Sequence, residues 1–221
     1  MESRRRYRAI YDHVLSRIYD LYMAWYMLPY GGEPRFRRGM LEGLEFRSGE
    51  RVLDCTCGTG NATAALRRRL DAGVLVGSDL SRGQLRRARR KRALSGVPLL
   101  QADATHLPFP PAAFDSVFLP HAIHEMPRAV RGAALREALR VCGSEGRVVV
   151  LELDRPESLW LRLLIGTWFF FWVPGFINFE TPTRRDLQRR GVVNEVREAG
   201  FAHVRRLSKF AGTMQAVEGR P

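Results

Sequence analysis

Two glycines and three carboxylates are the residues whose types and spacing point most directly to chemistry. Gly58 and Gly60 come shortly after an apolar run that ends at Asp54. Glycines at such a turn let the backbone approach a ligand closely, with the amides of a following helix directed at it. Asp79 comes nineteen residues after Gly60, and Asp103 follows a third apolar run. This pattern predicts a site for an extended, polar, nucleoside-like molecule.

Each carboxylate suits a different part of such a ligand. Asp79 can accept hydrogen bonds from two ribose hydroxyls, as an acidic residue at the end of a second strand does in dinucleotide-binding folds. Asp103 can accept from the exocyclic amine of adenine, and Asp54 fits a cationic amino group. A nicotinamide dinucleotide is less well matched, because its fingerprint needs a third glycine where this chain has Thr63.

A group of titratable residues follows the fourth apolar run. His121, His124 and Glu125 stand there, and a histidine beside a ligand crevice can act as a general base. We take His124 as the catalytic candidate; the alternatives are a purely structural histidine and a metal pair formed with His121. We predict no bound metal ion, because the sequence shows no third ligand and we interpret Cys55 and Cys57 as packing residues.

The elements that would position these residues alternate along the chain. The β-rich runs are 51–55, 74–79, 97–102, 113–119 and 147–153, the helical stretches are about 60–71, 82–94, 129–142 and 182–199, and two β-like runs lie near 202–207 and 210–217. Such alternation is typical of βαβ units and a parallel sheet. With 221 residues, 45% of them hydrophobic, and no internal repeat, one domain with a substantial core is expected.

These motifs resemble the class I S-adenosylmethionine-dependent methyltransferases. The resemblance rests on 52–54, 57–60, Asp79 and 103–115, and covers roughly residues 48–155 plus the helix ending near Phe201; Thr56 departs from it, where the family usually has its first glycine. It implies an α/β, Rossmann-like, seven-stranded and mostly parallel sheet with helices on both faces and an antiparallel C-terminal hairpin. It implies S-adenosyl-L-methionine as cofactor, bound by Asp54, Gly58, Gly60, Asp79, Leu80, Asp103 and Ala104.

Within that family the sequence is most similar to the ubiquinone/menaquinone biosynthesis C-methyltransferases, the type 11 branch. Leu107-Pro108-Phe109 and the paired Tyr11-Asp12 and Tyr19-Asp20 carry this likeness, while the Lys-Pro-Gly-Gly turn of the branch is replaced by 141–146. The expected domain is a single one over 1–221. It divides into an N-terminal helical cap (1–46), a cofactor-binding core (47–155), an apolar lid insertion (156–181) and the last helix with its hairpin (182–221).

The segment 159–176 is the most apolar part of the chain and includes Trp168 to Trp172. It is too short and too interrupted by Pro174 for a confident membrane span. We interpret it as a lid that contacts a lipophilic acceptor, a partner subunit of a homodimer or a bilayer, the alternative being a buried helical cap. It therefore favours a small or lipophilic methyl acceptor, such as a quinol-type ring or a lipid headgroup.

The net charge of +13 comes almost entirely from arginine. Several arginines cluster at 82–92. Such a cluster can bind an anionic surface, either a membrane or a nucleic acid, or it can simply be a helix face exposed to solvent. Without a signal-like leader or a disulfide framework, the expected location is cytoplasmic, with peripheral attachment to the inner face of a membrane. There are two alternatives to a methyltransferase that acts on a lipophilic acceptor: a nucleic-acid methyltransferase and a non-catalytic cofactor-binding protein. The first is disfavoured because residues 119–122 lack the Asn/Asp-Pro-Pro-aromatic motif.

Overall fold

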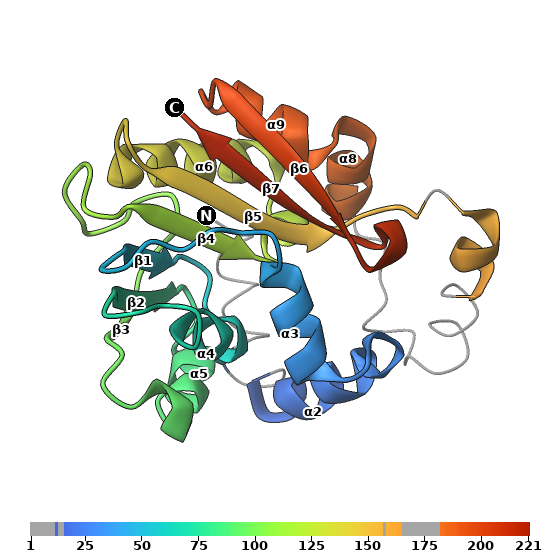
Figure 1. The fold of residues 1–221 in the computed structure, drawn as a ribbon, viewed down its shortest axis with the longest axis horizontal. Helices are drawn as coiled ribbons and strands as arrows, with labels where there is room; N and C mark the ends of the chain where they lie inside the picture. The colour runs from blue at the N-terminus through green and yellow to red at the C-terminus, as the bar shows by residue number, and fades with distance from the viewer. Residues whose placement is uncertain (1–11, 13–15, 157, 165–181) are drawn as a thin grey trace.

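The computed structural model describes residues 12, 16–156, 158–164 and 182–221. Seven strands form one sheet in the order β3-β2-β1-β4-β5-β7-β6 (Figure 1). The strands are β1 (Arg51–Asp54), β2 (Val74–Asp79), β3 (Leu99–Gln101), β4 (Ser116–Pro120), β5 (Arg147–Leu153), β6 (His203–Lys209) and β7 (Met214–Arg220). The first five are parallel, and β7 is antiparallel to both β5 and β6. This confirms the predicted mostly parallel sheet with an antiparallel C-terminal hairpin.

Helices cover both faces of the sheet. The α-helices are α2 (Ser16–Tyr26), α3 (Glu33–Leu41), α4 (Asn61–Arg67), α5 (Arg82–Ala88), α6 (Arg128–Cys142), α8 (Pro182–Arg190) and α9 (Val192–Glu198), and residues 159–164 form a further short helix. Helices α6, α8 and α9 pack with one face of β1, β4, β5 and β7 in one apolar core. Helices α2, α3 and α4 pack on the other face in a second core.

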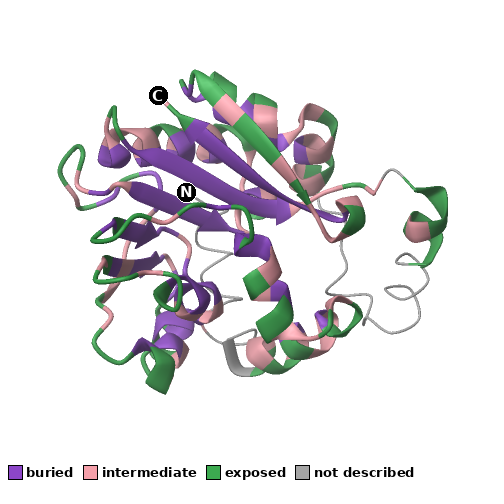
Figure 2. Cartoon of the chain, viewed as in Figure 1, coloured by how far each residue is buried: buried purple, intermediate pink, exposed green. Residues whose placement is uncertain are grey.

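Strand β4 lies at the centre of the sheet and is buried along its whole length, as Figure 2 shows. Apolar side chains alternate between the two cores: Val117 and Leu119 face α6, while Phe118 faces the side of α3 and α4. Burial of side chains of this size stabilises the fold by about 1.5–3 kcal/mol each. The central strands therefore form a rigid platform for the loops that leave their carboxyl ends.

Strand register brings the acidic strand ends together. Asp54 is paired with Gly77 of β2 and with Phe118 of β4, and Asp79 is paired with Gln101 of β3. Because these strands are parallel, the loops after β1, β2, β3 and β4 leave from one edge of the sheet. Ligands bind at that edge in open α/β folds.

Several predicted elements have other bounds than expected; the helix expected over 60–71 ends at Arg67, and the strand expected over 113–119 begins at Ser116. The helix expected over 182–199 is broken into α8 and α9 at Gly191, whose φ of +81° no helix accommodates. The helix expected to reach residue 94 ends near Ala88, and 92–94 form a separate 3-10 turn. The last β-like run begins at Met214 rather than 210, because Phe210–Gly212 form a turn with Ala211 in a left-handed conformation.

Parts of two predicted segments fall outside the described residues. These are the beginning of the N-terminal cap (1–11 and 13–15) and most of the apolar insertion (157 and 165–181). Within the N-terminal cap, a 3-10 turn over Leu28–Tyr30 separates α2 from α3 and leads into two glycines with positive φ. Among the helices described, none has the length and hydropathy of a membrane-spanning segment.

Candidate active site

The glycine-rich loop connects β1 to α4. Gly58 and Gly60 both have positive φ, +54° and +82°, a conformation that glycine adopts without strain. A Cβ at Gly60 would overlap the side chain of Leu94, whereas one at Gly58 would have nothing within 4 Å. Gly60 is therefore needed for packing of the loop, and Gly58 leaves open space beside it.

Asp79 holds this loop from the end of β2. Its Oδ2 accepts a hydrogen bond from the Gly58 amide at 2.9 Å, and its Oδ1 accepts one from the Ser81 amide at 2.8 Å. Burial raises the pKa of Asp79 to about 6, although these two amides oppose the shift. The carboxylate thus ties together the loops that follow β1 and β2, and it also faces the adjoining pocket.

Asp54 lies deeper in the structure than Asp79. It is fully buried, its Oδ2 accepts a hydrogen bond from Thr63 Oγ1 at 2.7 Å, and its Oδ1 has no hydrogen-bond partner in the described part of the chain. Burial raises the pKa of Asp54 to about 7. Thr63 stands where the nicotinamide fingerprint would have its third glycine, and its role here is to orient this carboxylate.

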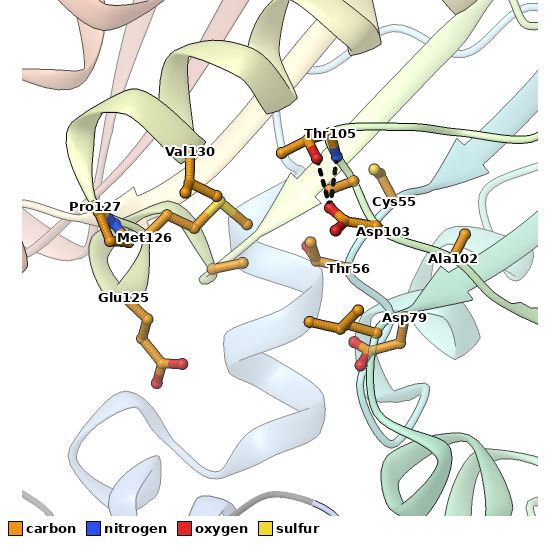
Figure 3. A pocket seen from close by; sticks show the side chains of 13 residues that line it. Cys55, Thr56, Asp79, Ala102, Asp103, Thr105, Glu125, Met126, Pro127 and Val130 are labelled. Atoms are coloured by element: carbon orange, nitrogen blue, oxygen red, sulfur yellow. Dashed lines mark hydrogen bonds between the residues drawn. The ribbon is translucent and has the colours of Figure 1, made fainter. Parts of the chain in front are cut away.

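A pocket opens at the carboxyl ends of β1, β2 and β3 (Figure 3). It encloses about 680 Å³ of empty space, part of it open to solvent. Asp103 faces it while accepting hydrogen bonds from the amide and hydroxyl of Thr105, at 2.9 and 2.8 Å. The other lining residues are mostly apolar or small: Cys55, Thr56, Leu80, Ala102, Ala104, Ala122, Met126, Pro127 and Val130, with Asp79 and Glu125 as the further acids.

The structure brings together four of the predicted cofactor-binding residues in the pocket wall, namely Asp79, Leu80, Asp103 and Ala104. Asp54, Gly58 and Gly60 belong to the strand end and loop behind that wall. The lining fits a nucleoside, because apolar walls suit a flat base and the two aspartates suit amine and hydroxyl donors. Thr56 Oγ1 is a further sign of a polar ligand, since it is buried in this wall and has no hydrogen-bond partner among the described residues.

His124 lies immediately beyond the pocket, on a 3-10 turn (Ile123–Glu125) that follows β4. Its Nδ1 is 2.9 and 3.0 Å from the two carboxylate oxygens of Glu152, a fully buried residue of β5. His124 does not line the pocket itself, but its neighbours Ala122, Glu125 and Met126 do. The arrangement places a basic nitrogen next to the candidate ligand site.

His121 has a different environment from His124. It is in a left-handed conformation (φ +51°), and its ring packs 5.5 Å from that of Phe36. Burial lowers the pKa of His121 to about 3, so that it is neutral in the folded protein. In the described ranges, no three histidine, cysteine or acidic side chains converge as a metal centre would require. The three cysteines are buried, as predicted for packing residues.

Two aspartates of the N-terminal region reach the loops of the site. Asp20 of α2 accepts hydrogen bonds from Thr59 Oγ1 at 2.6 Å and from Lys91 Nζ at 3.0 Å. Asp12 accepts from Ser81 Oγ and from the Gly83 amide, at 2.5 and 2.8 Å. Sequence reasoning noted the two Tyr-Asp pairs but did not assign these contacts.

Fold and site together define an α/β protein with a pocket suited to a nucleoside at the carboxyl edge of its sheet. Comparison with known proteins identifies the class more closely. A family model described as "Methyltransferase domain" matches residues 52–146. The chain is 32% identical over 206 residues to an uncharacterized methyltransferase of Synechocystis sp., with 92% of this chain and 91% of that protein covered.

A second relative is a demethylmenaquinone methyltransferase of Beutenbergia cavernae, 38% identical over 158 residues, which cover 71% of this chain and 62% of that protein. Among solved structures, an S-adenosyl-L-methionine-dependent methyltransferase of Methanococcus maripaludis matches with a TM-score of 0.71 and 16% identity, over 95% of this chain and 93% of that one. The chain belongs to the class I S-adenosylmethionine-dependent methyltransferases, and its cofactor is S-adenosyl-L-methionine.

Proposed function

We propose that this methyltransferase transfers a methyl group to a carbon of a lipophilic, hydroxylated ring of the quinol type. The observation that carries the proposal is the pair of His124 and Glu152 beside the pocket, because only an acceptor that must lose a proton needs a base. The names of relatives such as the demethylmenaquinone methyltransferases of Beutenbergia cavernae and Thermus thermophilus, 38% and 36% identical, support the same acceptor class.

The cofactor supplies a methyl group on a positively charged sulfur, already a strong electrophile, so the protein mainly binds and aligns the reactants. In this proposal Asp79 accepts from the ribose hydroxyls, Asp103 accepts from the adenine amine, and Asp54 provides negative charge for the amino acid end. Leu80 and Ala104 contact the base, and Gly58 and Gly60 allow close approach of the loop. His124 accepts the hydroxyl proton of the acceptor.

The test is transfer of radiolabelled methyl from the cofactor to a demethylated quinol, with phosphatidylethanolamine and RNA as parallel acceptors. We expect label in the quinol, and His124→Ala should lower kcat by about 10²–10⁴-fold while cofactor affinity changes little, since it removes a base rather than a cofactor contact. Label only in phosphatidylethanolamine or in RNA would replace the proposed acceptor. Cofactor binding without transfer to any of the three would indicate a non-catalytic binding protein.

We also propose peripheral attachment to an anionic bilayer through the short helix 159–164. Four of its large apolar side chains are strongly exposed: Leu159, Trp160, Leu163 and Leu164, at 67%, 83%, 53% and 67%. Arg155 and Arg162 are exposed beside them, which suits acidic headgroups. The basic helix α5 lies in the half of the molecule away from this helix (Figure 1), so its arginines and this apolar helix can be tested separately.

Trp160→Glu combined with Leu164→Glu should abolish flotation with phosphatidylglycerol-containing vesicles. Each apolar side chain contributes about 1.5–3 kcal/mol when fully buried, so losing two reduces membrane partitioning by at least about 100-fold. The matched charge control is the double variant Arg86→Glu with Arg90→Glu. Arg86 lies in α5, Arg90 follows just after it, and both are exposed. Unchanged flotation of the Trp160/Leu164 variant would exclude this helix as the attachment site.

A further inference from the structure

Glu152 stands out in β5 as a carboxylate in a buried, otherwise aliphatic stretch. The strand reads Arg-Val-Val-Val-Leu-Glu-Leu, and Glu152 is completely inaccessible to solvent. Both of its oxygens approach His124 Nδ1, and the carboxylate also accepts hydrogen bonds from the Leu153 amide at 2.8 Å and the His124 amide at 3.3 Å. Burying a carboxylate is costly unless it is paired and hydrogen-bonded in this way.

This contact determines which ring nitrogen of His124 is available. A carboxylate can only accept, so Nδ1 carries the hydrogen and Nε2 is the basic nitrogen of the neutral ring. Nε2 lies 3.9 Å from Glu125 Oε1, and Glu125 lines the pocket. Nε2 of His124 is therefore on the side of the ring near Glu125, a residue of the pocket wall.

Charged groups on several elements act on this histidine. Burial alone would lower the pKa of His124, but Glu152 and, more weakly, Glu125 stabilise the imidazolium and raise it. Arg184 of α8 acts in the opposite direction. His121 also lies close enough to interact with His124, but its low pKa keeps it uncharged. His124 is therefore a stronger base than an isolated histidine and is neutral only above its raised pKa.

We propose that Glu152 is a positioning residue that fixes His124 in the Nδ1–H form and strengthens Nε2 as a base toward an acceptor that carries a phenol-type hydroxyl. The inference rests on the proposed function and narrows its acceptor. In the step, the acceptor O–H bond breaks and its proton moves to Nε2. The ring carbon bonds to the methyl group as the methyl–sulfur bond breaks with its electron pair going to sulfur. The ring C–H proton then leaves to solvent, its bonding pair restores the aromatic ring, and the proton held on Nε2 returns to the ring oxygen.

The kinetic test compares pH–rate profiles of the wild type, Glu152→Gln and Glu152→Asp. In the wild type, kcat should rise as the pH rises through the pKa of His124. Glu152→Gln removes the charge that raises this pKa, so the rising limb should move down by about one pH unit or more, and the plateau should fall about 10–100-fold because the base is weaker and less well oriented. Glu152→Asp should retain the limb, and KM for the cofactor should stay the same throughout.

A second readout needs no acceptor. Nitrogen-15 NMR of the imidazoles should show a His124 titration that moves down in Glu152→Gln, with His121 unprotonated in both proteins as an internal reference. Glu145→Gln, exposed just before the other end of β5, is the matched control and should change neither readout. Thermal denaturation confirms that each variant is folded.

The two readouts separate the failure of this inference from failure of the proposed function. An unmoved His124 titration and an unmoved pH–rate limb in folded Glu152→Gln would overturn the role of Glu152. The His124 titration could instead shift in Glu152→Gln while the protein methylates amines but no hydroxylated ring. That result would support the effect of Glu152 on His124, and it would overturn the phenol-type acceptor together with the proposed function.

Discussion

Asp79→Ala should reduce the affinity for S-adenosyl-L-methionine by roughly 10²–10⁴-fold. The carboxylate binds the amides of Gly58 and Ser81, and hydrogen bonds to a charged group contribute about 1.5–3 kcal/mol each. The substitution therefore removes the hydrogen bonds that connect two loops of the site as well as the proposed contact to the ribose. Isothermal titration calorimetry with the cofactor and with its demethylated product measures the loss.

Asp71→Ala is the matched control for this prediction, since Asp71 is exposed and remote from the pocket lining. The affinity of the Asp71→Ala variant for S-adenosyl-L-methionine should equal that of the wild type. Wild-type affinity should also increase as the pH rises from about 5 to 8. In the proposed site Asp54, with a pKa of about 7, must ionise to pair with the cationic amino group, and Asp79, with a pKa of about 6, accepts hydrogen bonds from the ribose hydroxyls more strongly when ionised. An Asp79→Ala affinity within threefold of the wild type would contradict the assigned role.

Arg131→Ala should lower the free energy of unfolding by about 3–5 kcal/mol. Arg131 is completely buried in α6, where its Nη2 donates to Asp186 of α8 at 2.6 Å and to Glu195 of α9 at 3.0 Å. Its Nη1 donates to the carbonyl of Met126 at 3.1 Å. Removing Arg131 leaves buried Glu195 with Arg190 as its remaining cation at 2.6 Å and opens a cavity between the three helices, and both effects are destabilising.

For a chain of this size, that loss corresponds to a fall in Tm of about 6–20 °C. Calorimetry should show it, and Glu195→Gln in the same background should recover part of it. Arg128→Ala provides the control on the same helix, because the pair of Arg128 and Glu198 is more than half exposed and such pairs contribute less than about 1 kcal/mol. Equal Tm values for the Arg131 and Arg128 variants would show that the buried network does not stabilise the fold.

Features that depend on a few neighbouring residues could be predicted from the sequence. A strand that ends in Asp54, a turn with Gly58 and Gly60, and an acid at position 79 are local patterns. Because the strands are parallel, these strand ends and turns meet at one edge of the sheet, and this does not depend on how the core packs. Asp79 and Asp103 therefore appear in the pocket wall as expected.

Features that depend on tertiary packing could not be predicted. Glu152 is 28 residues from His124, and only the pairing of β4 with β5 brings the two together; the visible sign was a glutamate within an aliphatic run. Arg131 looked like one of many arginines, although α8 and α9 bury it completely. The break at Gly191 was missed because the apolar spacing of a helix continues across it.

The position of β7 between β5 and β6 has a consequence for the order in which the protein is made. Strand β6 is synthesised before β7, yet in the sheet of the described residues β7 is its one neighbouring strand. Until residues 214–220 have left the ribosome, β5 therefore keeps an open edge and β6 has no place in the sheet. The strands β1 to β4 around the pocket can therefore pair early in the nascent chain, whereas the edge formed by β5, β7 and β6 is completed only after residues 214–220 have emerged.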